Sequence, residues 1–324
     1  MNEDPPRFEL PCPELGPWRS GNSGTEGVWR FESGAAGADV LVTALIHGNE
    51  LCGAWAVLAA LQAGLRPRRG ALTLALCNLA AFDRFDVQHP EASRRVDQDL
   101  NRVWGTMAWR AAGAQTSEQR RALELLPFAE RAEWLLDLHS MHNPGPALVL
   151  TGLQDRNMAL ARRLGTPGLA VADAGHAAGC RLRDHGRFGD LADAVSRSLL
   201  IECGFHGELA AREVAIDMLG RFLLASGTLD EGDLPAGWLR PLPEAVSALE
   251  VTEAVTARAG EAPRFAQAWH AGQRIAAAGT LLGWNAGEPF HTPYADCTLI
   301  MPSVERVVPG MTIVRLAREI PAKA

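Results

Sequence analysis

Short apolar runs alternate with longer helical patterns along the first 226 residues of the chain. The run at 39–46 is apolar and rich in β-branched residues, which predicts a strand covered on both faces, and the Ala-, Leu- and Trp-containing stretch at 50–63 predicts the helix that follows it. Further strands are predicted at 71–77, 134–138, 147–151 and 198–202, and further helices at 117–132, 155–164 and 208–226. Strands that alternate with helices indicate an α/β fold, with a mostly parallel mixed sheet and helices on both of its faces.

The pattern changes near residue 245, after a stretch at 227–245 that is rich in Gly, Pro and Trp. Short runs at 249–257, 279–282, 298–301 and 312–316 are separated there by Gly and Pro, which predicts a small all-β domain. A length of 324 residues suits one large and one small domain, so we predict domains at 1–245 and 246–324. Residues 1–35 are rich in Pro, Gly and Ser, which predicts a loosely ordered lead-in or an edge element.

Composition narrows the range of partners. The 31 basic and 38 acidic residues give a net charge of -7, which argues against nucleic acid or an anionic membrane as a partner. The N-terminal sequence has no signal-peptide pattern and no run of 18 apolar residues occurs, so we expect a cytoplasmic protein. The six cysteines form no C-x-x-C pair, which indicates neither a disulfide framework nor a thiolate zinc site. Whether the chain forms a homo-oligomer is left open.

The first candidate for chemistry is His47-Gly48-Asn49-Glu50, at the turn between the first predicted strand and helix. A spacing of three residues at such a corner lets an imidazole and a carboxylate bind one ion, and zinc accepts both kinds of ligand. His139 follows the strand predicted at 134–138, on the same face as Asp137, and offers a third ligand. Taken singly, a turn histidine before a helix-start glutamate, or a strand-end histidine, has an ordinary structural interpretation as well.

Two further groups stand beside these motifs. Glu202 ends the very apolar strand predicted at 198–202, where a charge is costly unless it has a partner or a task; a solvent-facing carboxylate is the alternative. The segment at 94–102 concentrates arginine and amide groups suited to binding a carboxylate or an oxyanion, although a solvated charged loop has the same composition. Ligands collect at the carboxyl ends of strands in such sheets, where His47, His139 and Glu202 are all predicted to lie.

Four short segments, in their order along the chain, resemble the motifs of the succinylglutamate desuccinylase/aspartoacylase family, a branch of the zinc carboxypeptidase superfamily. They are His47-Gly-Asn-Glu50, Asp99-Leu-Asn-Arg102, Asp137-Leu-His139 and Ile201-Glu-Cys-Gly204. The resemblance covers about residues 40–220, and the sequences at 298–302 and 307–310 are similar to the family's C-terminal pattern. It implies a zinc carboxypeptidase-like domain at 1–245 that holds one Zn²⁺ per chain.

The resemblance implies a metal centre and a base. His47, Glu50 and His139 match the zinc ligands of the family. Glu202 matches the general base that takes a proton from the metal-activated water and returns it to the departing nitrogen. Two histidines and one glutamate leave open whether another divalent metal replaces zinc in the cell.

The resemblance also implies roles for the segment at 94–102. Asn101 and Arg102 match the pair that binds the substrate carboxylate, and Arg94 matches the arginine that polarises the scissile carbonyl. Asp99 matches an aspartate that orients a ligand histidine through its second ring nitrogen.

The implied activity is hydrolysis of the amide bond of a small N-acyl amino acid, or of a similar amide that bears a carboxylate. The alternatives are a metallocarboxypeptidase acting on short peptides and a non-catalytic zinc-binding protein of the same fold. Aspartoacylases carry a further arginine shortly before the catalytic glutamate, but the interval 190–201 here has only Arg197, so the resemblance leaves a preference for acidic side chains open. For five residues the sequence leaves open whether they line the pocket or lie at the surface: His142, His185, His206, Arg187 and Tyr294.

Overall fold

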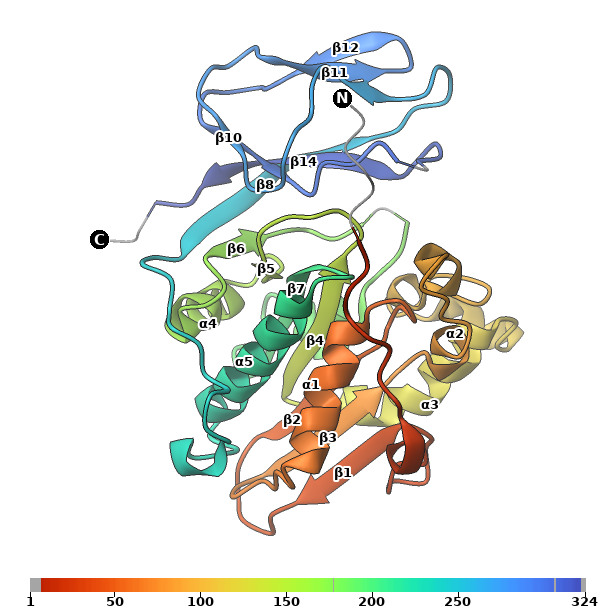
Figure 1. The fold of residues 1–324 in the computed structure, drawn as a ribbon, viewed down its shortest axis with the longest axis vertical. Helices are drawn as coiled ribbons and strands as arrows, with labels where there is room; N and C mark the ends of the chain where they lie inside the picture. The colour runs from red at the N-terminus through yellow and green to blue at the C-terminus, as the bar shows by residue number, and fades with distance from the viewer. Residues whose placement is uncertain (1–6, 177, 306, 322–324) are drawn as a thin grey trace.

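The computed structural model describes residues 7–176, 178–305 and 307–321 (Figure 1). Its helices are α1 (Leu51–Gln62), α2 (Leu79–Phe82), α3 (Ser117–Arg131), α4 (Asp155–Leu164) and α5 (Leu209–Ala225). Its strands are β1 (Val28–Glu32), β2 (Asp39–Ala44), β3 (Ala71–Leu76), β4 (Trp134–Met141), β5 (Leu148–Leu150), β6 (Leu169–Ala172), β7 (Arg197–Phe205), β8 (Ser247–Thr256), β9 (Arg264–Phe265), β10 (Arg274–Ile275), β11 (Leu281–Asn285), β12 (Glu288–His291), β13 (Cys297–Ile300) and β14 (Thr312–Glu319). No helix among these residues is both long and apolar enough to cross a membrane.

The strands of the first 172 residues and β7 form a mostly parallel mixed sheet, in the order β1-β3-β2-β4-β7-β5-β6. The pairs β3-β2, β2-β4, β4-β7 and β5-β6 are parallel, whereas β1 and β3, and β7 and β5, are antiparallel. The predicted α/β fold class is confirmed. The strand β6, which the sequence analysis did not identify, has four residues, too few for a periodicity to appear.

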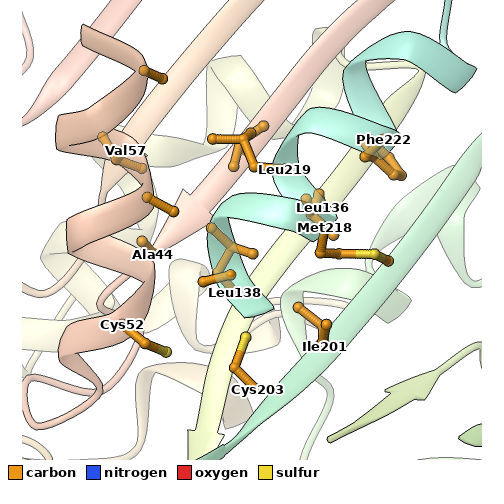
Figure 2. Packing of buried hydrophobic residues seen from close by; sticks show 14 of the residues in the cluster. Ala44, Cys52, Val57, Leu136, Leu138, Ile201, Cys203, Met218, Leu219 and Phe222 are labelled. Atoms are coloured by element: carbon orange, nitrogen blue, oxygen red, sulfur yellow. The ribbon is translucent and has the colours of Figure 1, made fainter. Parts of the chain in front are cut away.

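Successive side chains along the central strands point to opposite faces of the sheet and pack in two separate cores. Val40, Val42 and Ala44 of β2 pack with Leu136 and Leu138 of β4 against α1 and α5. Figure 2 shows this packing, with Val57 of α1 and Leu219 and Phe222 of α5 gathered over the strands. The α1 and α5 helices therefore cover one face of the sheet, and residues of even number on β2 and β4 belong to that face.

The odd-numbered residues of these strands face the other way. Leu41 and Leu135 pack with Ala122, Leu125 and Ala129 of α3. Thr116 is the N-cap of α3, and its hydroxyl accepts a hydrogen bond from the Gln119 amide in a capping box. Helices consequently lie on both faces of the sheet, as predicted.

The C-terminal strands extend the same sheet. β8 pairs with β6, and the order continues as β6-β8-β14-β13-β10, while β12, β11 and β9 form a separate three-stranded sheet (Figure 1). The apolar residues of this part are divided between its own core and an interface with β5, β6 and β7. The short C-terminal strands agree with a small β domain, and the boundary near residue 245 stays a prediction.

Candidate metal centre

The turn after β2 places the side chains of His47 and Glu50 on the same side of the turn. Gly48 lies so close to the next segment that a Cβ atom there would collide with the backbone of Ala81, Phe82 and Ser93. The Gly48 amide also donates a hydrogen bond to the Arg94 carbonyl at 3.2 Å. A side chain at Gly48 would thus push away the segment that leads to Arg94, which explains the glycine in the motif.

The second pair of residues comes from two neighbouring strands. His139 of β4 and Glu202 of β7 are register partners across the parallel ladder. Both side chains point away from the face of the sheet that α1 and α5 cover. Their sequence neighbours Leu138, Ile201 and Cys203 point toward that face and pack in its core. His139 and Glu202 were predicted at strand ends, but the two strands stay paired as far as Met141 and Phe205, so both residues lie inside strands.

The three predicted ligands meet in the interior of the protein. One ligand atom each from His47, Glu50 and His139 lies within 4.8 Å of the other two. The carboxylate of Glu50 stands between the two imidazoles, with Oε1 2.7 Å from His47 Nδ1 and Oε2 2.7 Å from His139 Nδ1. Burial acts to raise the pKa of Glu50, but the two histidines hold it well below its usual value, so the carboxylate is charged.

The second nitrogen of each ring faces an aspartate. His47 Nε2 lies 2.9 Å from Asp99 Oδ1, and His139 Nε2 lies 3.0 Å from Asp137 Oδ2. Asp137 is itself held by Thr43, whose hydroxyl donates to Oδ1 at 2.7 Å. An aspartate at Nε2 favours the tautomer with the proton on that nitrogen, which leaves Nδ1 of both rings as the metal-binding atom.

The chemistry of these residues fits a divalent metal. Among the described residues, the buried polar atoms without a hydrogen-bond partner include two carboxylate oxygens of this centre, Glu50 Oε2 and Glu202 Oε2. Such atoms are costly in a protein interior unless another group satisfies them. Two neutral imidazole nitrogens and a carboxylate are a donor set of the kind found in catalytic zinc sites.

Glu202 lies beside this donor set and is electrostatically different from Glu50. Burial raises the pKa of Glu202 to about 8, and the nearby Glu50 carboxylate acts in the same direction. A carboxylate whose pKa is raised by burial is a better proton acceptor than an exposed one. The environment thus suits a group that takes and returns a proton.

Arg94 reaches the centre from the loop before Asp99. Its Nη2 lies 2.9 Å from His47 Nε2 and 3.3 Å from Asp99 Oδ2, and its Nη1 lies 3.6 Å from Glu50 Oε1. If His47 Nε2 carries a proton toward Asp99, it cannot also accept one from Arg94, so the hydrogen bond of Arg94 is to Asp99. Burial acts to lower the pKa of Arg94, but the carboxylates of Asp99 and Glu50 raise it above its usual value.

Glu118, a buried residue in the first turn of α3, shapes this loop and was missed by the sequence analysis. Its carboxylate accepts hydrogen bonds from the backbone amides of Val96, Asp97 and Gln98 at 2.6, 3.1 and 3.1 Å. The Asn78 side chain donates to the same carboxylate at 3.2 Å. The first turn of α3 thereby anchors the residues just before Asp99. The only signal in the sequence was a glutamate at a helix start, which is common.

Asn101 and Arg102 follow Asp99 in a single 3-10 turn, Leu100–Arg102. The Asn101 side chain is buried and accepts a hydrogen bond from the Leu182 amide at 3.2 Å through Oδ1, so its Nδ2 is the group oriented to donate. Arg102 donates to the Asn101 carbonyl at 2.7 Å and lies 3.9 Å from Asp99 Oδ2. With 22% of its side chain exposed, Arg102 is accessible to a ligand.

The loop at 181–187 contains three arginines, of which the first two are buried and the third is exposed. Arg181 and Arg183 are fully buried. Arg181 pairs with Asp173 and Asp184 at 2.9 and 2.6 Å, and Arg183 donates to the Ser198 hydroxyl at 2.9 Å. Their role is to hold the loop that carries Leu182 against Asn101.

The five residues that could line the pocket or lie at the surface are found at different places in the structure. Arg187 is exposed, and His185 lies against the Trp104 ring with Nδ1 3.2 Å from the Gly105 carbonyl. His142 Nε2 is 3.0 Å from the Ser303 hydroxyl, and the Tyr294 hydroxyl is 2.6 Å from that of Thr252, within the C-terminal part. His206 is buried, with Nδ1 2.8 Å from the hydroxyl of Ser140, next to His139.

Comparison with known proteins connects this geometry with one group of enzymes. Residues 36–177 match the model of the succinylglutamate desuccinylase/aspartoacylase catalytic domain, a range that includes the three predicted ligands and the segment at 94–102 but ends before Glu202. A probable aspartoacylase from Parasynechococcus marenigrum (strain WH8102) is 36% identical over 144 residues. The aligned part is 41% of this chain and 44% of that relative, so it spans less than half of either protein.

Two solved structures are similar over most of the chain. The succinylglutamate desuccinylase from Vibrio parahaemolyticus aligns with a TM-score of 0.64 and 14% identity, over 92% of this chain and 87% of the other. The succinylglutamate desuccinylase/aspartoacylase from Rhodobacter sphaeroides aligns with a TM-score of 0.64 and 17% identity, over 91% and 89% of the two chains. At these identities the likeness shows that the fold is shared, C-terminal strands included.

Proposed function

The chain belongs to the succinylglutamate desuccinylase/aspartoacylase family, and on that premise we propose that it is a zinc-dependent amidohydrolase. Its substrate is a small N-acyl amino acid or a similar amide that carries a carboxylate. The observation that supports this most is the buried donor set of His47, Glu50 and His139, with Glu202 on the neighbouring strand.

In this proposal the three ligands bind the metal through His47 Nδ1, His139 Nδ1 and the Glu50 carboxylate. Zn²⁺ supplies a Lewis acid that activates a water and polarises the amide carbonyl. Asp99 and Asp137 keep the proton on Nε2 of each histidine, so that both Nδ1 atoms can bind.

The remaining residues act on the substrate. Glu202 takes a proton from the attacking water and later gives it to the departing nitrogen, since an amine leaves readily only when it is protonated. Arg94 faces the negative charge that develops on the carbonyl oxygen. Asn101 Nδ2 and the guanidinium of Arg102 would bind the substrate carboxylate and thereby orient the amide for attack.

The experiment that tests the proposal combines metal analysis with a substrate screen. The purified chain is expected to contain one zinc per chain, measured by atomic emission, and to release free amine from at least one N-acetyl, N-succinyl or N-formyl amino acid. A chain that binds no zinc and stays inactive after zinc is added would end the enzyme proposal. Release of C-terminal residues from short peptides alone would favour a carboxypeptidase instead.

The Glu202→Gln variant separates the base from the metal ligands. We expect kcat to fall by about 10²- to 10⁴-fold or more, because the proton acceptor is lost, while the zinc content stays near that of the unmodified chain. Loss of zinc from this variant would contradict the role of Glu202 as base.

The Arg102→Ala variant tests the carboxylate-binding pair. We expect it mainly to raise KM, because the carboxylate is held in both the ground state and the transition state. An unchanged KM would remove Arg102 from the substrate site.

A further inference from the structure

Arg315, a buried arginine of β14, contacts the segment that follows β6. It lies between Val314 and Leu316, which pack in the core of the C-terminal strands, so its side chain points to the other face of the strand. There its Nε lies 3.5 Å from Asp173 Oδ2, and its Nη2 lies 3.1 and 3.0 Å from the two ring nitrogens of His176. Only 5% of the Arg315 side chain is exposed.

The contact with Asp173 begins a mostly buried row of alternating charges, the charge row Arg315–Asp173–Arg181–Asp184–Arg183. Asp173 Oδ2 accepts a hydrogen bond from Arg181 Nη1 at 2.9 Å, and Arg181 Nε donates to Asp184 Oδ2 at 2.6 Å. Asp184 also accepts from Arg183 Nη1 at 2.5 Å. Burial acts to raise the pKa of Asp173, but the charges of Arg315 and Arg181 hold it below its usual value, so the carboxylate is charged. Each member depends on its neighbours, since a buried charge that loses its partner is costly.

The charge row fixes the chain beside the candidate carboxylate-binding pair. Leu182, which lies between two arginines of the row, donates its amide hydrogen bond to Asn101 Oδ1 at 3.2 Å. Cys180 forms a parallel β-bridge with Val103, and its carbonyl accepts a hydrogen bond from the Trp104 amide at 3.3 Å. The two stretches of chain therefore run side by side, and the Leu182 amide orients the Asn101 side chain so that Nδ2 is its donor.

A second set of contacts connects Arg315 with Arg102. Nη2 of Arg315 is almost equally distant from both ring nitrogens of His176, so it lies over the face of the ring, because an in-plane position would collide with the carbon between them. The His176 carbonyl accepts a hydrogen bond from the Gly179 amide at 3.3 Å. Gly179 in turn lies so close to the Arg102 carbonyl that a Cβ atom there would collide with it. Successive contacts thus lead from β14 to both members of the pair.

We propose that Arg315 is a positioning residue, which holds Asn101 and Arg102 in the geometry that binds the substrate carboxylate. It acts through Asp173 and Arg181 on Asn101, and through the backbone after β6 on Arg102, without touching the substrate itself. The C-terminal strands would then contribute to substrate affinity from outside the carboxylate site. The inference rests on the proposed function for the role of the pair, whereas the connection between β14 and the pair does not.

The connection is tested without substrate, by amide hydrogen exchange of the full chain. Arg315→Met removes the charge and keeps a side chain that fills part of the space, so we expect the Leu182 and Trp104 amides to exchange at least about fivefold faster. The amides of β2 should keep their rates, which excludes a general loss of stability. Arg318→Met, on the same strand but exposed and paired with Glu250, should change neither set. Unchanged rates at Leu182 and Trp104 in Arg315→Met would overturn the inference.

The consequence for binding is tested by steady-state kinetics of the zinc-loaded chain, with the N-acyl amino acid that the substrate screen identifies. We expect Arg315→Met to raise KM by about 3- to 30-fold and to leave kcat within about twofold, because the carboxylate is held in the ground state and the transition state alike. In a chain that already carries Asn101→Ala and Arg102→Ala, Arg315→Met should change kcat/KM by less than about twofold, since no pair is left to position. Equal effects in both chains, or a loss in kcat alone, would mean a general structural role and would overturn the inference.

If Arg315→Met does not fold, Arg315→Lys decides. It keeps a charge near Asp173 but has no planar group to lie over the His176 ring, so we expect KM to rise by about threefold or more. A KM equal to that of the unmodified chain would overturn the inference. If the screen finds no substrate, the proposed function fails, whereas the exchange rates still support or refute the connection. Hydrolysis together with unchanged exchange would refute the inference alone.

Discussion

Each of the two candidate histidine ligands stands between two carboxylates. Glu50 is shared by both rings, and Asp99 and Asp137 stand at the far nitrogens. Of the two aspartates, the resemblance implied a role only for Asp99. Asp137 is two residues before His139 on the same face of β4, so its position was visible in the sequence, but its alignment with Nε2 depends on Thr43 of the neighbouring strand.

At the scale of one residue, we predict that Asp137→Asn lowers zinc affinity by about 10- to 100-fold, because the amide no longer favours the proton on His139 Nε2. Competition with a chelator of known affinity measures the change. Asp296→Asn, which removes an exposed carboxylate of the C-terminal part, is the charge-matched control and should leave the affinity unchanged. Equal affinities of the Asp137 variant and the unmodified chain would show that this aspartate does not orient the ligand.

At the scale of elements, α3 determines the shape of the segment that carries Asp99, Asn101 and Arg102. Its Glu118 carboxylate binds three successive amides of the loop, and no regular secondary structure fixes that loop by itself. The position of these three candidate residues consequently depends on a helix that lies further along the chain.

We predict that Glu118→Gln destabilises the protein by about 1–3 kcal/mol, because a charged acceptor of three amides is replaced by a group with one acceptor atom. Urea unfolding measures the stability, and hydrogen exchange should become faster at the amides of 96–98. Glu124→Gln, on the same helix but exposed, should change stability by no more than about 0.5 kcal/mol. Unchanged exchange at 96–98 would contradict the anchoring role.

The elements also show what could be predicted from the sequence. The strands β2, β4 and β7 were visible as apolar runs, and neighbouring parallel strands bring their carboxyl ends together, so the meeting of His47, His139 and Glu202 was predictable. The buried positions of Arg181, Arg183 and Arg315 were not, because their partners lie on distant segments and an arginine-rich loop ordinarily faces water. The pairing of β4 with β7 beyond residues 138 and 202 could not be predicted either, because it depends on the partner strand.

At the scale of the whole molecule, the C-terminal strands complete both the sheet and a core. Leu148 of β5, Val171 of β6 and Leu200 of β7 pack with Ile300 of β13 and Ala317 of β14. β8 also occupies the edge of β6. Removal of this part would expose an apolar face and an unpaired strand edge together.

We predict that a chain ending at residue 245 aggregates or binds a dye specific for exposed apolar surface, because β6 then becomes an open edge. Size-exclusion chromatography and dye fluorescence, compared with the full chain, measure this. A truncated chain that is monomeric and as resistant to protease as the full chain would show that residues 1–245 are an independent folding unit, in agreement with the predicted domain boundary.

The continuous hydrogen bonding from β6 through β8 to β14 limits how the C-terminal strands can move relative to the rest of the protein. A part joined to its neighbour by a strand ladder cannot swing on a linker as a hinged lid does, because any large rotation would break that ladder. In the proposed enzyme, substrate entry and product release would therefore depend on the loops around the candidate site. Variation in those loops can change what the enzyme admits while the metal and its ligands stay in place.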